Sequence, residues 1–157
     1  MIFIIVLIIL ILDQTAKFLA TKFLILDQPV AIIKNIFSLT LIHNTGAAFG
    51  IFKDQGMLFI VISIIAIILI CSTLKRNRHL KLYCFSLSLI LAGAIGNLID
   101  WIFRGYVVDF LDFRIWPVFN IADSAITVGA ILLGYSIICT PKSAEYVRLQ
   151  FILMALL

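Results

Sequence analysis

Gly93 to Asp123 reads GAIGNLIDWIFRGYVVDFLDFRIWPVFNIAD, and this stretch decides how the chain is organised. It holds four of the eight acidic residues, namely Asp100, Asp109, Asp112 and Asp123. It lies between two long apolar runs that are each able to cross a lipid bilayer. A carboxylate so close to lipid is costly, and these four acids therefore require an explanation in structure or in chemistry.

The composition of the whole chain is that of a membrane protein. Of its 157 residues, 64% are hydrophobic and only 13% are charged, whereas a soluble domain has about 45–50% apolar and about 25% charged residues. In a soluble protein the net charge of +4 could suggest nucleic acid, but here the basic residues cluster and indicate orientation in a membrane. We therefore expect one membrane domain over residues 1–157, contacts with membrane lipids, and no nucleic-acid partner.

Four apolar segments are long enough to span a bilayer. We expect these spans at about residues 2–21, 57–74, 82–103 and 121–139. The short loop 75–81 between the second and third spans is rich in Lys and Arg, which places it in the cytoplasm. Both termini, with the tail 142–157, are then cytoplasmic, and the loops 26–56 and 104–120 are outside.

The first outer segment departs from the helical pattern. Ile36 to Asn44 contains β-branched and aromatic residues in partial alternation, which predicts one or two short strands. NTGAAFG, Asn44 to Gly50, follows and is typical of a tight turn or of a close backbone approach to a ligand. We read the second outer segment, residues 104–119, as a short aromatic loop. The predicted fold is an all-α integral membrane protein of four transmembrane helices with a small extracytoplasmic β-element.

Two charged residues fall inside the first span. Asp13 and Lys17 are four residues apart and share one helix face, with the acid first. In lipid such groups are expected to face the bundle interior and to pair with each other. A polar path for a transporter or channel subunit is the alternative class of function. It would need polar groups through the full depth of several helices, and the second span has few.

The chemistry open to the outer side rests on carboxylates. Three cysteines without metal-binding spacing and two distant histidines predict neither a metal site nor a cofactor. A serine–lysine dyad of Ser124 and Lys17 is one alternative. Two carboxylates within hydrogen-bond reach share a proton, so that one can activate a carbonyl while the other takes a proton from water.

Asp109 and Asp123 are the favoured pair, and Asp112 is a weaker rival. Asp109 is an acid inside an apolar run. Asn120 is the predicted N-cap of the fourth helix, and Asp123 is then the third residue of that helix. The alternative interpretation makes Asp123 a helix cap only and leaves Asp109 in solvent.

Four blocks of the chain together resemble the signature blocks of the lipoprotein signal peptidases, also called signal peptidase II. They are DQTAK (13–17), NTGAAFG (44–50), GNLIDWIFRGYVVDF (96–110) and FNIADSAI (119–126), in the family's order. The resemblance implies an intramembrane aspartyl endopeptidase of the bacterial cytoplasmic (inner) membrane. It would remove signal peptides from diacylglyceryl-modified prolipoproteins by cutting before the lipidated cysteine. We expect a monomer without a metal or cofactor.

The resemblance also assigns roles to residues. It implies that Asp109 and Asp123 are catalytic, at the outer face of the membrane. The implied supporting residues are Asp13, Lys17, Asn44, Gly46, Asn97, Asp100 and Asn120. One position departs from the family, because Trp101 stands where an arginine usually follows the aspartate of GNxxD. Either Arg104, one helical turn further on, substitutes for it, or the chain is a weakened or divergent member of the family.

Overall fold

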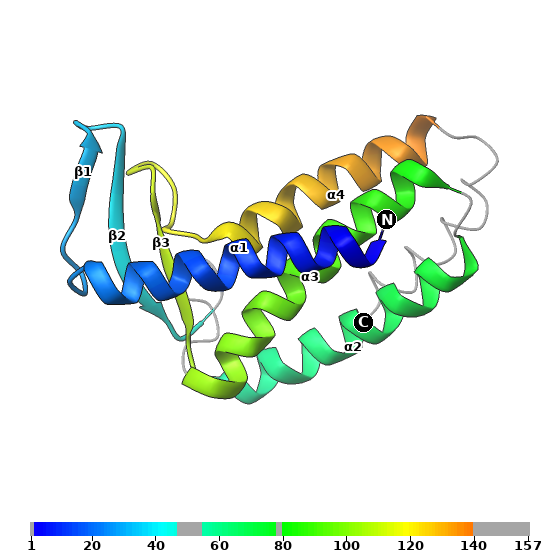
Figure 1. Ribbon diagram of the computed structural model, residues 1–157, viewed down its shortest axis with the longest axis horizontal. Helices are drawn as coiled ribbons and strands as arrows, with labels where there is room; N and C mark the ends of the chain where they lie inside the picture. The colour runs from blue at the N-terminus through cyan, green and yellow to red at the C-terminus, as the bar shows by residue number, and fades with distance from the viewer. Residues whose placement is uncertain (1, 47–54, 78–79, 140–157) are drawn as a thin grey trace.

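The computed structural model of the protein describes residues 2–46, 55–77 and 80–139 (Figure 1). Their seven elements form a helical bundle with a small sheet at one end. In chain order they are helix α1 (Ile2–Phe23), strands β1 (Val30–Ile33) and β2 (Phe37–Asn44), helices α2 (Gly56–Arg76) and α3 (Lys81–Arg104), strand β3 (Val107–Asp112) and helix α4 (Ile121–Cys139).

All four helices are long and apolar enough to cross a membrane. Their surfaces are inverted relative to those of a soluble protein. Large apolar side chains such as Phe3 and Ile138 are 76% and 82% exposed, whereas Asp13 and Lys17 are completely buried. A bilayer stabilises the apolar exterior, and buried charges must pair inside the bundle. The four helices and the small sheet confirm the predicted fold class.

Helix α3 is the centre of the bundle and packs against α1, α2 and α4. Small residues allow the closest of these contacts. A Cβ atom added at Gly93 would meet the carbonyl oxygen of Ala122 in α4, and one added at Gly129 would lie 2.8 Å from the carbonyl oxygen of Ser86 in α3. The backbones of α3 and α4 therefore approach each other without side chains between them.

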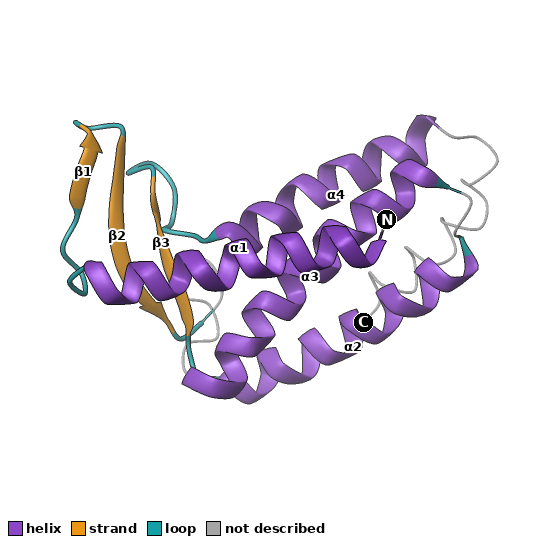
Figure 2. Cartoon of the chain, viewed as in Figure 1, coloured by secondary structure: helices purple, strands orange, loops and turns teal. Residues whose placement is uncertain are grey.

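The three strands form one antiparallel sheet in the order β1-β2-β3 (Figure 2). Strand β2 lies within the segment predicted to be extended. Strand β3 corrects the prediction of a loop over residues 104–119, because Val107–Asp112 pairs with β2. The α3 helix ends at Arg104 and is capped by Gly105, whose φ of 75° is left-handed and suits glycine. The chain turns there directly into β3.

The β3 strand is packed against α1 through one of its faces. Val108 and Phe110 join Ala20 of α1 and Leu41 of β2 in a buried cluster. Successive side chains of a strand point to opposite faces, so Asp109, between Val108 and Phe110, points away from this cluster. The packing of two apolar neighbours thus aims one carboxylate into the bundle.

Candidate active site

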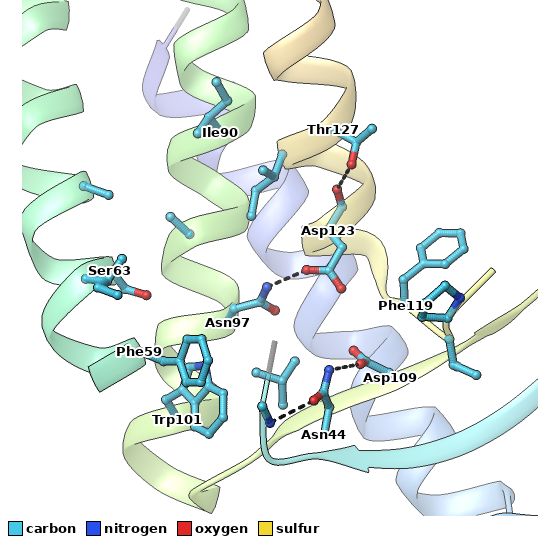
Figure 3. Close-up of a pocket in the computed structure, with 18 of the residues that line it drawn as sticks. Asn44, Phe59, Ser63, Ile90, Asn97, Trp101, Asp109, Phe119, Asp123 and Thr127 are labelled. Atoms are coloured by element: carbon cyan, nitrogen blue, oxygen red, sulfur yellow. Dashed lines mark hydrogen bonds between the residues drawn. The ribbon is translucent and has the colours of Figure 1, made fainter. Parts of the chain in front are cut away.

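A cavity of about 800 Å³ lies beside the sheet, between helices α2, α3 and α4 (Figure 3). Its walls combine apolar side chains with a few polar groups. The charged residues among the described lining are Asp109 from β3 and Asp123 from α4; every other described lining residue is uncharged. Two consecutive elements, β3 and α4, thus bring two carboxylates to one cavity.

Asp109 is held by two side-chain amides. Asn44 Nδ2 donates to its Oδ2 at 2.9 Å, and Asn120 Nδ2 donates to its Oδ1 at 2.7 Å. The side chain is buried, with Asp109 only 1% exposed. Burial, followed by the charge of Asp123, raises the pKa of Asp109 to about 7, although the two amide donors oppose the rise. This carboxyl group can therefore carry a proton near neutral pH.

Asp123 lies in the first turn of α4. Asn97 Nδ2 of α3 donates to its Oδ1 at 2.8 Å, and the backbone N–H of Asn120 donates to its Oδ2 at 3.3 Å. The positive end of a helix dipole favours a negative charge at this position. These donors and the helix N-terminus thus stabilise the charged form of Asp123.

Asn120 connects the two aspartates. Its Oδ1 accepts a hydrogen bond from the backbone N–H of Asp123 at 2.8 Å, which confirms the predicted N-cap. With its oxygen committed to the helix, its Nδ2 is left to donate to Asp109 and, at 3.2 Å, to Asn97 Oδ1. Asn120 is completely buried. Asn120 therefore both caps α4 and bridges the two carboxylates.

Lys17 lies behind this pair and is completely buried. Its Nζ is 2.9 Å from Asp13 Oδ2, 2.9 Å from Asp100 Oδ2 and 3.0 Å from Asn97 Oδ1. The Asp13–Lys17 pair is thus confirmed, and Asp100 joins it from α3. Because Asn97 Oδ1 faces the ammonium group, its Nδ2 must face Asp123. The lysine sets the orientation of that amide.

The two acids paired with Lys17 also bind the backbone beside the cavity. Asp13 Oδ1 accepts a hydrogen bond from the N–H of Ala122 at 2.9 Å. Asp100 Oδ2 accepts one from the N–H of Val108 at 3.2 Å. Ala122 directly precedes Asp123, and Val108 directly precedes Asp109. One buried lysine thus organises two carboxylates that each hold the residue before a cavity-lining aspartate.

The alternative catalytic residues considered from the sequence have other partners in the structure. Asp112 accepts hydrogen bonds from Thr40 Oγ1 at 2.7 Å and from the backbone N–H of Arg114 at 2.8 Å. Burial opposes the effect, but these bonds and the Arg114 charge hold the pKa of Asp112 below its ordinary value. Ser124 Oγ donates to the carbonyl of Asn120. Lys17 has three N–H donors and three oxygen partners, so the serine–lysine dyad is not assembled.

The remaining expected residues divide between the cavity and its surroundings. Gly46 lines the cavity, and its N–H donates to Asn44 Oδ1 at 3.0 Å. The rest of NTGAAFG, residues 47–50, and the tail 142–157 lie outside the described residues. Arg104 Nε is 3.5 Å from Asp100 Oδ1, and Arg104 is absent from the described lining.

Sequence reasoning missed two residues next to the site. Gln14 Nε2 donates to Asp13 Oδ2 at 3.0 Å and to the carbonyl of Gly96 at 3.2 Å, which joins α1 to α3. A polar residue beside Asp13 in an apolar span was an available signal. Phe59 stacks on Trp101 in the cavity wall. Phe59 is one of 13 phenylalanines, and sequence offered no signal for it.

The fold and the cavity define a multi-pass membrane protein with a polar site at one end of its bundle. The family model described as signal peptidase (SPase) II matches residues 5–139, so the chain belongs to the signal peptidase II family, a family of peptidases.

Similar proteins carry the name of this family, and a solved membrane enzyme shares the fold. The chain is 47% identical to a lipoprotein signal peptidase of Halothermothrix orenii, over 85% of this chain and 92% of that protein. It is 50% identical to one from Caldanaerobacter subterraneus subsp. tengcongensis, over 81% and 88%. A solved bacterial membrane enzyme structure superposes with a TM-score of 0.83 at 32% identity, covering 92% of this chain and 90% of the other.

Proposed function

We propose that this protein is an aspartyl endopeptidase that removes signal peptides from diacylglyceryl-modified prolipoproteins, cutting before the lipid-modified cysteine, with Asp109 and Asp123 as the catalytic pair. Family membership supports prolipoproteins as the substrates. One observation carries the catalytic assignment: Asn120 bridges the two carboxylates at the wall of a cavity that opens between membrane-spanning helices.

The surroundings of the two carboxyl groups suit different protonation states. Asp109 carries the proton, because burial and the neighbouring carboxylate raise its pKa to about 7. We assign the negative charge to Asp123, which is at the N-terminus of α4 and less buried than Asp109, because the helix dipole and two donors stabilise that charge. This division provides one acid and one base in the same hollow, which is the requirement for concerted proton transfer.

The reaction follows from that division. Asp123 takes a proton from a water molecule as the water oxygen bonds to the scissile carbonyl carbon. The proton of Asp109 is donated to the carbonyl oxygen, which prevents a full negative charge on it. The C–N bond then breaks when the proton held by Asp123 passes to the leaving amine, and the oxygen proton returns to Asp109. Both aspartates end the cycle as they began it.

The cavity suits a substrate that enters from lipid. Its lining continues from the two aspartates along α2, α3 and α4 through apolar residues such as Ile62, Ile90 and Ile126. We place the sheet at the outer face of a bacterial cytoplasmic membrane and the 75–81 loop inside. The signal helix then lies along this apolar length, and the lipid-modified cysteine reaches the aspartates from the outer leaflet.

The test uses purified protein and a lipid-modified prolipoprotein peptide. Asp109→Asn and Asp123→Asn are each expected to lower the cleavage rate by at least about 10³-fold, because each removes one half of the acid–base pair. Asp112→Asn is the matched control, since it changes a carboxylate of the same strand that is absent from the described lining, and we expect it to retain cleavage. Full cleavage by either of the first two variants refutes the pair.

A further inference from the structure

Phe59 and Trp101 form one wall of the cavity (Figure 3). Phe59 lies in the first turn of α2, and Trp101 lies in the last turn of α3. Their ring centroids are 5.0 Å apart and their planes are within 10° of parallel. Both residues are at the end of the bundle that carries the sheet, so this wall stands at the mouth proposed to face outward.

The tryptophan ring is fixed in this wall from more than one side. Trp101 is only 6% exposed. A Cβ atom added at Gly56 would lie 3.3 Å from Trp101 Cε3, so the start of α2 touches the indole ring with no side chain between them. Stacking on Phe59 and contact with Gly56 leave the indole little freedom. Trp101 is therefore a rigid part of the wall and not an adaptable side chain.

The electrostatics of the cavity are one-sided. The described lining contains two aspartates, of which Asp123 is proposed to be the ionised one, and no cation, and Lys17 is completely buried behind Asn97. The opposite side, Trp116–Phe119, provides aromatic and aliphatic side chains. An anionic group that enters here loses water to an apolar wall, lies near the negative charge of Asp123, and finds no positive partner among the described lining residues. An uncharged group of the same size meets none of these costs.

We propose that the Phe59–Trp101 wall makes this enzyme selective for an uncharged residue directly after the lipid-modified cysteine, and that it discriminates against an acidic residue there. The inference rests on the proposed function, which places the signal helix along the apolar length of the cavity. The residue that follows the lipid-modified cysteine then leaves past the outer ends of α2 and α3, where the two rings lie. Trp101 determines specificity because it offers this substrate residue a rigid apolar surface and no positive charge.

The experiment compares two lipid-modified peptides that differ only by Asn or Asp directly after the modified cysteine. These side chains have nearly the same shape and differ in charge. The wild-type protein is expected to cleave the Asn peptide with a kcat/KM about tenfold above that of the Asp peptide. Trp101→Arg provides the missing cation, and the ratio should fall to about twofold.

Trp101→Gln is the matched control, since it removes the stack without adding charge, and its ratio should stay above that of Trp101→Arg. If Trp101→Arg does not fold, Phe59→Arg and Phe59→Gln place the same contrast on the other ring of the wall. Equal cleavage of the two peptides by the wild-type protein overturns the inference and leaves the proposed function standing. The same ratio in the Arg and Gln variants also overturns it. Cleavage of neither peptide by the wild-type protein instead rejects the proposed function.

Discussion

Replacement of Lys17 by Met tests the buried network most directly. Methionine preserves much of the length and removes the ammonium group that contacts Asp13, Asp100 and Asn97. Both aspartates are completely buried, and the cation left beside them among the described residues is Arg104, 3.5 Å from Asp100 Oδ1. Removal of one partner of a buried ion pair costs about 3–5 kcal/mol, against a total stability of about 5–15 kcal/mol.

The assay is thermal unfolding of the purified protein in detergent, followed by circular dichroism. Lys22→Met is the control, because Lys22 is an exposed lysine of the same helix and its loss should stay within about 0.5 kcal/mol. The combined variant Asp13→Asn, Lys17→Met, Asp100→Asn removes all three charges and should recover part of the loss. If Lys17→Met unfolds at the same temperature as Lys22→Met, the network does not stabilise the bundle and the reasoning is refuted.

Three further predictions concern pH, helix packing and the bridge between the aspartates. The raised pKa of Asp109, about 7, means that between about pH 4 and pH 7 the folded state keeps a proton that the unfolded state has lost, so folding is progressively disfavoured as pH rises. Asp109→Asn should gain stability relative to the wild type between pH 4.5 and pH 8, and a melting-temperature difference that stays constant contradicts this. Gly129→Ala should lose about 1–3 kcal/mol in thermal unfolding because its Cβ meets α3, whereas Gly134→Ala, with open space around it, should gain up to about 1 kcal/mol. Asn120→Ser keeps a capping side chain and should stay within about 1 kcal/mol in stability, yet a peptide-cleavage assay should show kcat reduced at least about tenfold; unchanged kcat argues against the bridge.

The helices could be predicted because their signal is local. An apolar run of bilayer length predicts a span whatever lies elsewhere in the chain, and Asp13 and Lys17 pair through a spacing within one helix. The addition of Asp100 to that pair depends on how α1 and α3 pack, and no spacing in the sequence encodes it. The same limit applies to Arg104, which lies beside Asp100 and not in the described cavity lining.

Strand β3 shows why the outer segment was harder to predict. Five of its six residues pair with β2, which lies more than 60 positions earlier in the chain. Val107 to Phe110 are all buried, so the polar–apolar alternation that indicates a half-exposed strand is missing. The sequence indicated Asp109 because it is an acid within an apolar run. The direction of its side chain, toward the cavity, depends on the strand geometry and could not be read from the sequence. The roles of Asp109 and Asp123 in catalysis stay predictions for the assays above.

The completely buried Lys17 has a consequence for how the protein is assembled in a membrane. When α1 first enters the bilayer, Asp13 and Lys17 have only each other and Gln14 of the same helix, because Asp100, Asn97 and Ala122 belong to segments synthesised later. A charged side chain at the centre of a lone helix costs about 2.5–3.5 kcal/mol on insertion scales. The first helix therefore remains poorly accommodated by lipid until α3 and α4 arrive. The residues that position the cavity thus also make completion of the bundle a condition for stable insertion of its first helix.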